Sequence, residues 1–338
     1  MKLYGGIDLH SNNIVLTLQN NQDHPVYEKR LPNDLDWILH ELEAYSDSIA
    51  GLVVESTYNW YWLVDGLMEA DYKVHLANPA AIKQYEGLKY TDDKHDSRWL
   101  AHLLRLGILK EGYIYPKEER AVRDLFRKRS QLVRQRTTNV LSLQNLITRN
   151  TGKNLSGNRI KQLKEEDVDL LFPDVYLALA AKANLKVFHF LTEQIETIEK
   201  AVKKSVCLKP AFEPLRTVPG IGDILAMTIM LETGDIRRFP KVGNYASYCR
   251  CVKSERRSNE KSKGKGNEKN GNKFLAWAFV ESAHFAVRYE AKIKRYYQRK
   301  RAKSNGMVAI KAVANKLARA CYYLMRDQVA FDLNKAFN

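Results

Sequence analysis

The chain has 338 residues, with 55 lysines and arginines against 39 aspartates and glutamates, and a formal net charge of +16. Its 45% hydrophobic content excludes global disorder, and no stretch approaches the roughly 18 apolar residues of a membrane-spanning helix. The amino terminus shows no signal-peptide pattern, and four cysteines are too few for a disulfide scaffold. We therefore expect a cytoplasmic protein with one large or two to three ordinary domains and no membrane contact.

The first part of the chain alternates between strand and helix patterns. The expected strands cover Leu3–Asp8, Ile14–Leu18, Ile49–Glu55 and Lys73–Leu76. The expected helices, which have apolar residues three to four apart, cover Asp34–Tyr45, Tyr58–Glu69 and Ser97–Leu109. Strands that alternate with helices are typical of an α/β domain, which we place at residues 1–116.

The pattern becomes helical after residue 116. Long apolar stripes over Glu118–Arg149 and Leu177–Val206 predict an antiparallel helical or coiled-coil module over residues 117–206. Plain helix packing inside one larger domain is the alternative.

A mostly α-helical third domain is expected over residues 207–338. Helical patterns cover Asp223–Glu232 and Lys273–Arg288. Between them, Lys253–Asn272 has few apolar residues and many glycines, lysines, serines and asparagines, which predicts an exposed loop. A short glycine turn, Val218–Gly222, precedes the first of these helices.

The excess positive charge is concentrated in three segments. Lys117–Arg136 carries +5, Arg250–Lys273 carries +6 and Arg288–Lys303 carries +7, so the rest of the chain carries −2. A single basic run usually forms the solvent-exposed face of a helix, and binding to an anionic membrane surface is a weaker alternative explanation. Three runs of one sign favour nucleic acid. The candidate contacts in the first segment are Arg127, Lys128, Arg129 and Arg134.

Carboxylates stand at the ends of two expected strands and at the start of a helix. Asp8 and Glu55 end strands, where a buried acid is costly unless it is paired or bound to a metal. Asp93 and Asp96 lie three residues apart and so share one helix face. Strand termination and helix capping by Asp92, Asp93 or Asp96 are the ordinary explanations. Together, however, these acids suit a two-metal phosphodiester site, for which Mg²⁺ is the natural ion.

Several segments resemble the DEDD-type insertion-sequence transposases, relatives of the pilin-gene inversion recombinases, some of which are guided by a bridge RNA. The resemblance rests on Gly6–Ser11, Val53–Thr57, Thr91–Ala101, Thr217–Gly222 and Gly271–Lys273. It implies a first domain with a ribonuclease-H-like fold, close to RuvC Holliday-junction resolvases. It also implies a metal-binding acid set of Asp8, Glu55, Asp93 and Asp96. Because Asp92 precedes Asp93, the third acid stays open between them.

The same resemblance implies a nucleophilic serine in the loop before the Gly-Asn-helix element. Ser258 is the preferred residue, and Ser254 and Ser262 are the alternatives. The family serine is commonly followed by glycine, and here Asn259 follows, another residue that tolerates positive φ. Arg256, Arg257 and Lys261 would neutralise phosphate charge beside it.

The serine and the acids are expected to act on one scissile phosphate, within one chain or between chains. The glycine turn resembles a helix-hairpin-helix motif, in which Gly220 and Gly222 would let backbone amides approach a phosphate. A tight helix-helix turn is the plain alternative for that segment.

These observations predict a DNA transposase or recombinase that cuts and rejoins strands with Mg²⁺ and a serine. Its expected partners are element-end DNA, target DNA and a structured guide RNA, and it is expected to form a dimer or tetramer and to lie on the nucleoid when bound to DNA. A metal-dependent junction nuclease without covalent chemistry and a non-catalytic nucleic-acid-binding protein are the two alternatives.

Overall fold

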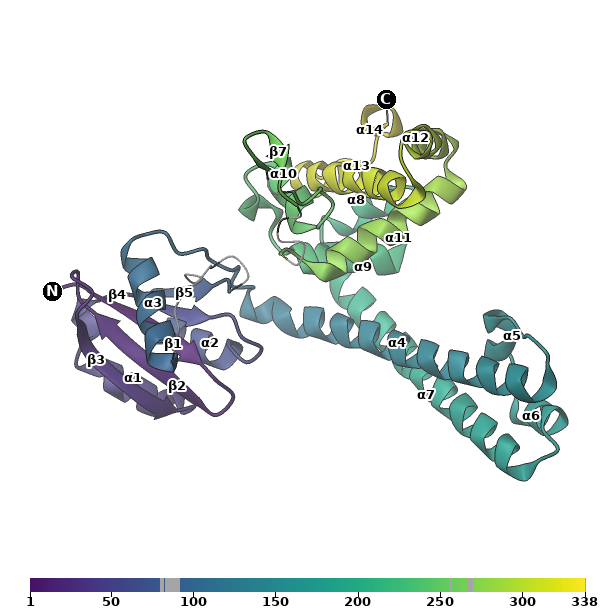
Figure 1. The fold of residues 1–338 in the computed structure, drawn as a ribbon, viewed down its shortest axis with the longest axis horizontal. Helices are drawn as coiled ribbons and strands as arrows, with labels where there is room; N and C mark the ends of the chain where they lie inside the picture. Colours follow the sequence, from purple (N-terminus) through teal and green to yellow (C-terminus); the bar gives the residue numbers. More distant parts are fainter. Residues whose placement is uncertain (80–81, 83–91, 256, 265, 267–269, 338) are drawn as a thin grey trace. The chain divides into compact units, whose positions relative to one another are not determined.

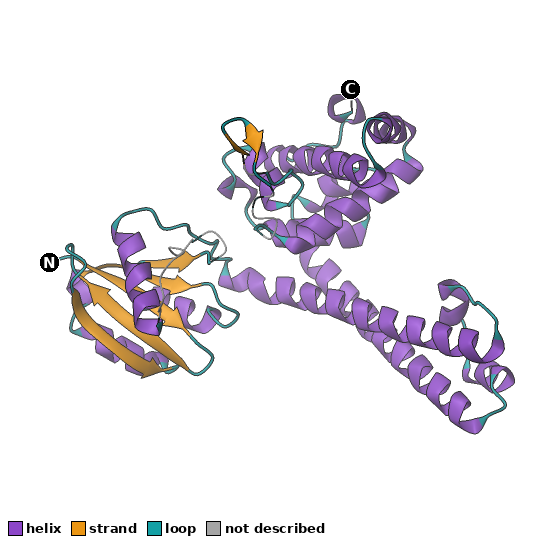
Figure 2. Cartoon of the chain, in the orientation of Figure 1, coloured by secondary structure: helices purple, strands orange, loops and turns teal. Residues whose placement is uncertain are grey.

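The computed structural model describes residues 1–79, 82, 92–255, 257–264, 266 and 270–337, and for Arg257 it describes the backbone alone. These residues form two compact units, Met1–Lys117 and Glu118–Asn338. The first unit is mixed α/β and the second is mostly helical (Figures 1 and 2), so the expected change of class along the chain is confirmed. Within the described part of the chain, no helix combines the length and the hydropathy needed to cross a bilayer.

The first unit is built on one five-stranded sheet of order β3-β2-β1-β4-β5. Its strands are β1 (Leu3–Leu9), β2 (Asn13–Gln19), β3 (Pro25–Pro32), β4 (Ile49–Glu55) and β5 (Val74–Ala77). The first three strands pair antiparallel, whereas β4 runs parallel to both β1 and β5. The carboxyl ends of β1 and β4, which are neighbours, therefore lie at the same edge of the sheet.

Helices cover both faces of this sheet (Figure 1). The helices α1 (Leu35–Glu43) and α2 (Tyr61–Glu69) pack on one face over the main core, which includes Ile7 and Val54. On the other face, α3 (Asp93–Arg105) packs against β1, β2 and β4. A 3-10 turn, η1 (Ser46–Ser48), leads into β4.

The sequence patterns did not predict β3. This strand is exposed along most of its length, begins and ends with proline, and carries glutamate, lysine and arginine in its middle. It is an edge strand, and charged side chains and prolines at such an edge discourage pairing with other chains. The same composition removes the apolar alternation by which strands are recognised, so the strand was missed.

The second unit contains two long antiparallel helices, α4 (Lys117–Thr151, which begins at the last residue of the first unit) and α7 (Val175–Val206). Arg129 of α4 bonds Glu199 of α7, and Arg136 bonds Thr192, so residue numbers rise on one helix as they fall on the other. The short helices α5 (Gly157–Lys161) and α6 (Glu165–Leu171) join their ends and share an apolar cluster with them.

The remaining elements form a helical bundle with the largest apolar core of the chain. They are α8 (Phe212–Arg216), α9 (Asp223–Thr233), η2 (Ile236–Arg238), α10 (Val242–Tyr248), β6 (Arg257–Ser258), β7 (Lys261–Ser262), α11 (Lys273–Tyr289), α12 (Ala291–Ala302), α13 (Gly306–Asp327) and α14 (Leu333–Ala336). The helix α13 packs against α8, α10, α11, α12 and α14, so it is central to the bundle.

Candidate active site

Asp8 and Glu55 meet at the carboxyl edge of the sheet. Side chains alternate across a strand, so Gly6 and Asp8 of β1 face the same side as Val53 and Glu55 of β4, the side covered by α3. Asp8 is only 5% exposed, and its carboxyl group shares a hydrogen bond with that of Glu55. The local strand pattern thus places two acids in contact at a partly buried edge.

Gly6 allows α3 to approach this edge. A Cβ atom at Gly6 would overlap the backbone oxygen of Ser97 and lie 2.8 Å from the backbone nitrogen of Ala101. The contact is fixed further by a buried hydrogen bond of 2.8 Å between the hydroxyls of Ser97 and Thr17 of β2. The first turn of α3 therefore lies directly on β1, beside Asp8.

The three acids at the start of α3 have different partners. Asp92 is the N-cap, and its Oδ1 accepts a hydrogen bond of 2.8 Å from the backbone N–H of His95. Asp93 and Asp96 face the sheet, and both act electrostatically on Asp8. The ligand atoms of Asp8, His10 and Asp93 lie within 4.8 Å of one another. The structure thus brings Asp8, Glu55, Asp93 and Asp96 together and gives Asp92 a capping role.

The charges in this cluster are not balanced evenly. Burial is the largest cause that raises the pKa of Asp8; His10 comes next and lowers it, and the nearby carboxylates of Asp96 and Asp93 raise it again. Burial also raises the pKa of Glu55, with Asp8 as the next cause. Asp93 differs, because a hydrogen bond from Arg30 lowers the pKa of its carboxyl group. His10 offsets the negative charge of the inner pair only in part, and a bound cation would relieve the rest.

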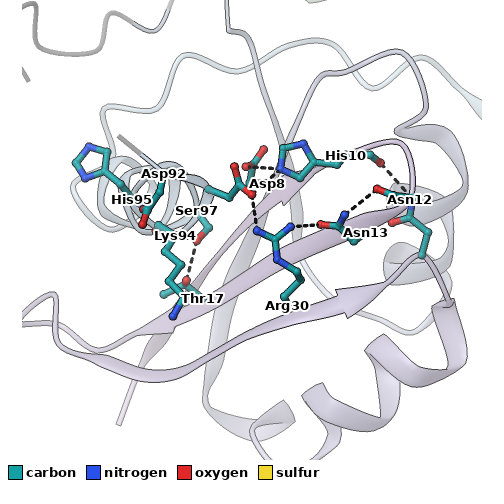
Figure 3. A network of polar contacts seen from close by, with 12 residues as sticks. Asp8, His10, Asn12, Asn13, Thr17, Arg30, Asp92, Lys94, His95 and Ser97 are labelled. Atoms are coloured by element: carbon teal, nitrogen blue, oxygen red, sulfur yellow. Dashed lines mark hydrogen bonds and ion pairs between the residues drawn. The ribbon is translucent and has the colours of Figure 1, made fainter. Parts of the chain in front are cut away.

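Two residues that the sequence-based prediction left out of the site belong to this cluster: His10 and Arg30 (Figure 3). The Nε2 atom of His10 lies 3.1 Å from Oδ2 of Asp8 and 3.4 Å from Oδ2 of Asp93. This nitrogen is buried and, among the described residues, has no partner in hydrogen-bonding geometry. The two-residue spacing from Asp8, which puts His10 on the same side of the strand, was the available signal.

Arg30 reaches the cluster from the edge strand β3. Its Nη2 donates to Oδ2 of Asp93 at 2.5 Å, and its Nη1 donates to Oδ1 of Asn13 at 2.7 Å. Because β3 itself was not predicted, no sequence pattern pointed to this contact. The outer acid of the cluster is therefore held by a guanidinium group that belongs to the same unit.

In the second unit, Ser258 lies at the tip of a small hairpin. Ser258 pairs with Lys261, and the two residues between them, Asn259 and Glu260, have φ values of 51° and 59°. Two successive positive φ values define a type I′ turn, which suits the twist of a two-residue hairpin. Asn259 thus takes the left-handed conformation that its residue type tolerates.

The three candidate serines have different surroundings. Ser258 and Ser262 are exposed, and Ser254 is half-buried. Ser262 forms a hydrogen bond with Glu255. The pKa of the Glu255 carboxyl group is lowered chiefly by its hydrogen bond with Lys253 and next by this one with Ser262. Within the described part of the chain, the hydroxyl group of Ser258 has no hydrogen-bond partner, so it is open to a ligand.

A buried polar network holds the base of this loop. Glu232 of α9 is 5% exposed and accepts hydrogen bonds from Nε and Nη2 of Arg127, at 2.6 and 2.7 Å. It also accepts one of 2.6 Å from Nδ2 of Asn272, whose Oδ1 caps α11. Gly271, with φ of +92°, packs so closely on Tyr248 that a Cβ atom would lie 2.5 Å from the Tyr248 backbone oxygen. The loop is therefore anchored at its carboxyl end by α4, α9 and α10.

The chain is similar to known transposases over both units. A family model described as "Transposase", of the DEDD type, matches residues 5–150, and one described as "Transposase IS116/IS110/IS902 family" matches residues 213–298. The chain belongs to this transposase family. The two matched segments contain the four clustered acids and the serine hairpin, respectively.

Relatives of this transposase family match at low identity. "Putative transposase y4qE" of Sinorhizobium fredii is 27% identical over 221 residues, which are 64% of this chain and 53% of the relative, so the chain spans about half of that relative's length. "Probable family 20 transposase" of Pseudomonas aeruginosa is 24% identical over 283 residues, 80% of this chain and 82% of the relative. A transposase for the insertion sequence element IS1328 of Yersinia enterocolitica is 26% identical over 148 residues, 43% of this chain and 44% of the relative.

The predicted nucleic-acid contacts of this family member lie in different settings. Arg127 is paired with Glu232, and Arg129 bonds Glu199, so both guanidinium groups hold the unit together. Lys128 and Arg134 are exposed on α4, and Lys261 is exposed on β7. Arg256 lies outside the described residues, and the side chain of Arg257 is not described.

The two glycines of the predicted hairpin turn also differ. Gly220, with φ of +86°, packs on α11, where a Cβ atom would lie 2.5 Å from the backbone oxygen of Ser282. Gly222 is exposed, has no atom near the place of a Cβ, and is the N-cap of α9. Packing alone thus accounts for Gly220, and phosphate binding by either glycine stays a prediction.

Proposed function

We propose that this chain is a recombinase that cuts and rejoins DNA during transposition of an insertion sequence. The observation that carries the proposal is the convergence of Asp8, Glu55, Asp93 and Asp96 at one sheet edge in a member of this family. Like charges that raise each other's pKa cost folding free energy, so such a cluster favours a functional role over a structural one.

The cluster fits divalent metal, and we propose Mg²⁺. Carboxylate oxygens are the hard ligands this ion prefers, and they would come from Asp8, Glu55, Asp93 and Asp96. The buried Nε2 of His10, within 3.4 Å of two carboxylates, would be an additional ligand or would orient Asp8. Bound divalent metal would supply charge neutralisation at the attacking and leaving oxygens of a phosphodiester.

We also propose that the first unit is ribonuclease-H-like and close to RuvC resolvases. The mixed sheet of order β3-β2-β1-β4-β5, with an antiparallel β1-β2-β3 part and acids at the ends of β1 and β4, supports this assignment. The acids of α3 complete the set because that helix packs on β1 at Gly6.

Ser258 is the nucleophile of the proposed reaction. Its oxygen forms a bond to phosphorus while one P–O ester bond of the DNA breaks. The serine proton passes to a basic oxygen, and the departing DNA oxygen takes up a proton. The resulting phosphoserine ester conserves the ester linkage, so a DNA hydroxyl can later attack it and release the serine. Exposure of Ser258 beside the cation of Lys261 supports this choice over Ser262, which is bonded to Glu255.

The partners of the proposed recombinase are element-end DNA, target DNA and a structured guide RNA. Joining two duplexes needs two or four protomers, and α7 offers a surface for assembly. Its residues Tyr176, Leu179 and Phe190, spaced by three and eleven residues, are 79%, 66% and 60% exposed, and this spacing is that of a coiled-coil seam. Because its substrate is chromosomal DNA, we place the protein in the bacterial cytoplasm, on the nucleoid.

The test is a covalent-adduct assay on a DNA that carries the element ends, with the adjoining noncoding RNA of the element added. The expected result is a denaturation-resistant protein–DNA adduct with Mg²⁺ and none with EDTA. Ser258→Ala should abolish the adduct, and Ser262→Ala, in the same hairpin, should keep it.

Two results would contradict the proposal. Metal-dependent cleavage without any adduct would instead identify a junction nuclease. Binding that is unchanged in Asp8→Ala, together with no cleavage by the wild-type protein, would identify a non-catalytic nucleic-acid-binding protein.

A further inference from the structure

One face of α11 exposes aromatic side chains that the proposed reaction does not use. Trp277, Phe285 and Tyr289 are 41%, 43% and 69% exposed. Their positions, eight and four residues apart, follow one flank of the helix over about 120°, next to the buried side that includes Leu275 and Phe279. Large exposed aromatic rings gathered on one face mark a binding surface.

The geometry of these rings suits stacking on planar groups. The rings of Phe285 and Tyr289 are parallel to within 7°, with centroids 6.5 Å apart. The guanidinium group of Arg288 lies 5.4 Å from the centroid of the Tyr289 ring. The rings therefore present parallel faces on this side of the helix, one of them next to a cation.

Cations outnumber acids on α11 and on the helix that follows it. Lys273 and Arg288 are exposed on α11, and its one acid, the half-buried Glu281, stands four residues from both Trp277 and Phe285. The next helix, α12, has no acidic residue and exposes Lys294, Arg295, Arg299, Lys300 and Arg301. A protein partner would have to be strongly acidic to lie here, whereas aromatic faces beside a row of cations are what a polynucleotide with unpaired bases requires.

We infer that the exposed face of α11, continued by the cations of α12, binds an unpaired nucleic-acid strand, with bases stacked on Trp277, Phe285 and Tyr289. A duplex hides its base faces, so this surface discriminates in favour of single-stranded segments. The inference goes beyond the proposed strand exchange and does not depend on the serine or on metal.

The test measures binding by fluorescence anisotropy in EDTA with the full chain carrying Ser258→Ala, so that chemistry cannot affect the result. The probes are oligo-dT and oligo-U of about 20 nucleotides, longer than common single-strand site sizes, and a duplex of equal length. Trp277→Ala and Tyr289→Ala should each weaken binding of a single-stranded probe by about tenfold and leave duplex binding unchanged. The two single-stranded probes distinguish DNA from RNA as the source of the strand.

Matched variants keep the test decisive. Trp37→Ala removes a tryptophan of similar exposure, 50%, from the first unit and should leave binding unchanged. Tyr289→Phe should bind like the parent protein. Arg295→Ala should reduce the steepness of the plot of log K against log salt concentration by about 0.7, the value for one phosphate contact on a single strand.

Equal loss of single-strand and duplex binding in Trp277→Ala would overturn the inference, because it would indicate charge alone. Unchanged binding of both single-stranded probes together with an altered oligomeric state would also overturn it and assign the face to a second copy of the chain. Normal strand exchange by Trp277→Ala would leave the proposed function intact, and failure of the adduct assay would leave this binding test intact.

Discussion

The two candidate reactive regions are built in opposite ways. The acidic cluster stands on the central strand of a sheet and on a helix that packs directly against it, with like charges held at a partly buried edge. The serine stands at the exposed tip of a two-residue hairpin whose loop is anchored at its base. A metal site needs fixed ligand positions, whereas a nucleophile must approach and leave a phosphorus atom. The contrast therefore matches the two parts of the proposed reaction.

The contrast predicts opposite effects of one change on activity and stability. Asp8→Asn should reduce strand exchange by at least about three orders of magnitude, or roughly 4 kcal/mol. Because it removes one of the repelling buried charges, it should also raise the thermal midpoint of the metal-free protein. Calorimetry with and without Mg²⁺ checks this, and added Mg²⁺ should stabilise the wild type more than the variant. A lower midpoint in Asp8→Asn would show that the cluster is not strained.

The anchor of the serine loop should be sensitive to loss of charge. Glu232→Gln leaves Arg127 without its carboxylate and should destabilise the protein by about 2–3 kcal/mol, below the value for fully buried pairs because Arg127 is partly exposed. The control Glu213→Gln removes an exposed pair with Arg216 and should cost about 1 kcal/mol or less. Urea unfolding measures both losses of stability. Equal losses would mean that the Glu232–Arg127 pair contributes no more than an exposed ion pair.

Two glycines of the loop give a matched pair. Gly271 and Gly264 both have positive φ, but only Gly271 packs so that a Cβ would meet the backbone, that of Tyr248. Gly264→Ala should cost about 1 kcal/mol from backbone strain alone. Gly271→Ala should cost about 2 kcal/mol more and should reduce adduct formation. A similar loss in both variants would show that the base of the loop tolerates displacement.

The pH dependence should distinguish the inner acids from the outer one. Asp8 and Glu55 have raised pKa values, so the folded state binds protons more readily than the unfolded state. At neutral pH the two charged groups therefore lower the free energy of unfolding, and this loss is recovered as the pH falls through their pKa values. Asp93 has a lowered pKa, so its stabilising contact with Arg30 is lost only at lower pH. As the pH is lowered, the stabilisation by Mg²⁺ should therefore decrease when Asp8 and Glu55 are protonated, before the contact of Asp93 with Arg30 is lost. Thermal scans across pH for the wild type and Asp8→Asn should converge on the acid side.

The smallest expected effect is at the tip of the hairpin. Glu260→Gly creates the Asn-Gly pair preferred in type I′ turns and should stabilise the hairpin by about 0.5 kcal/mol, because a residue with a Cβ is unfavourable at positive φ. Amide exchange of the β6–β7 hairpin measures this. Strand exchange should persist, and its loss would show that Glu260 itself takes part.

The change from α/β to helical structure and the approach of the acids could be expected from the sequence, because strand ends and the i, i+3 spacing of Asp93 and Asp96 are local patterns. His10 could have been added from its two-residue spacing to Asp8, whereas Arg30 could not. Arg30 comes from an edge strand without apolar alternation, and its contact with Asp93 spans 63 residues. The internal pairing of Arg127 and Arg129 was equally hidden, because charge counts do not show which cations meet an acid across the fold.

The absence of a side chain at Gly6 sets how far the acids of α3 stand from those of the sheet. A single methyl group at this position would change none of the reactive side chains, yet it would push α3 away from β1 and so separate Asp93 and Asp96 from Asp8. A residue that takes no part in the chemistry thus decides whether the two halves of the proposed metal site can meet.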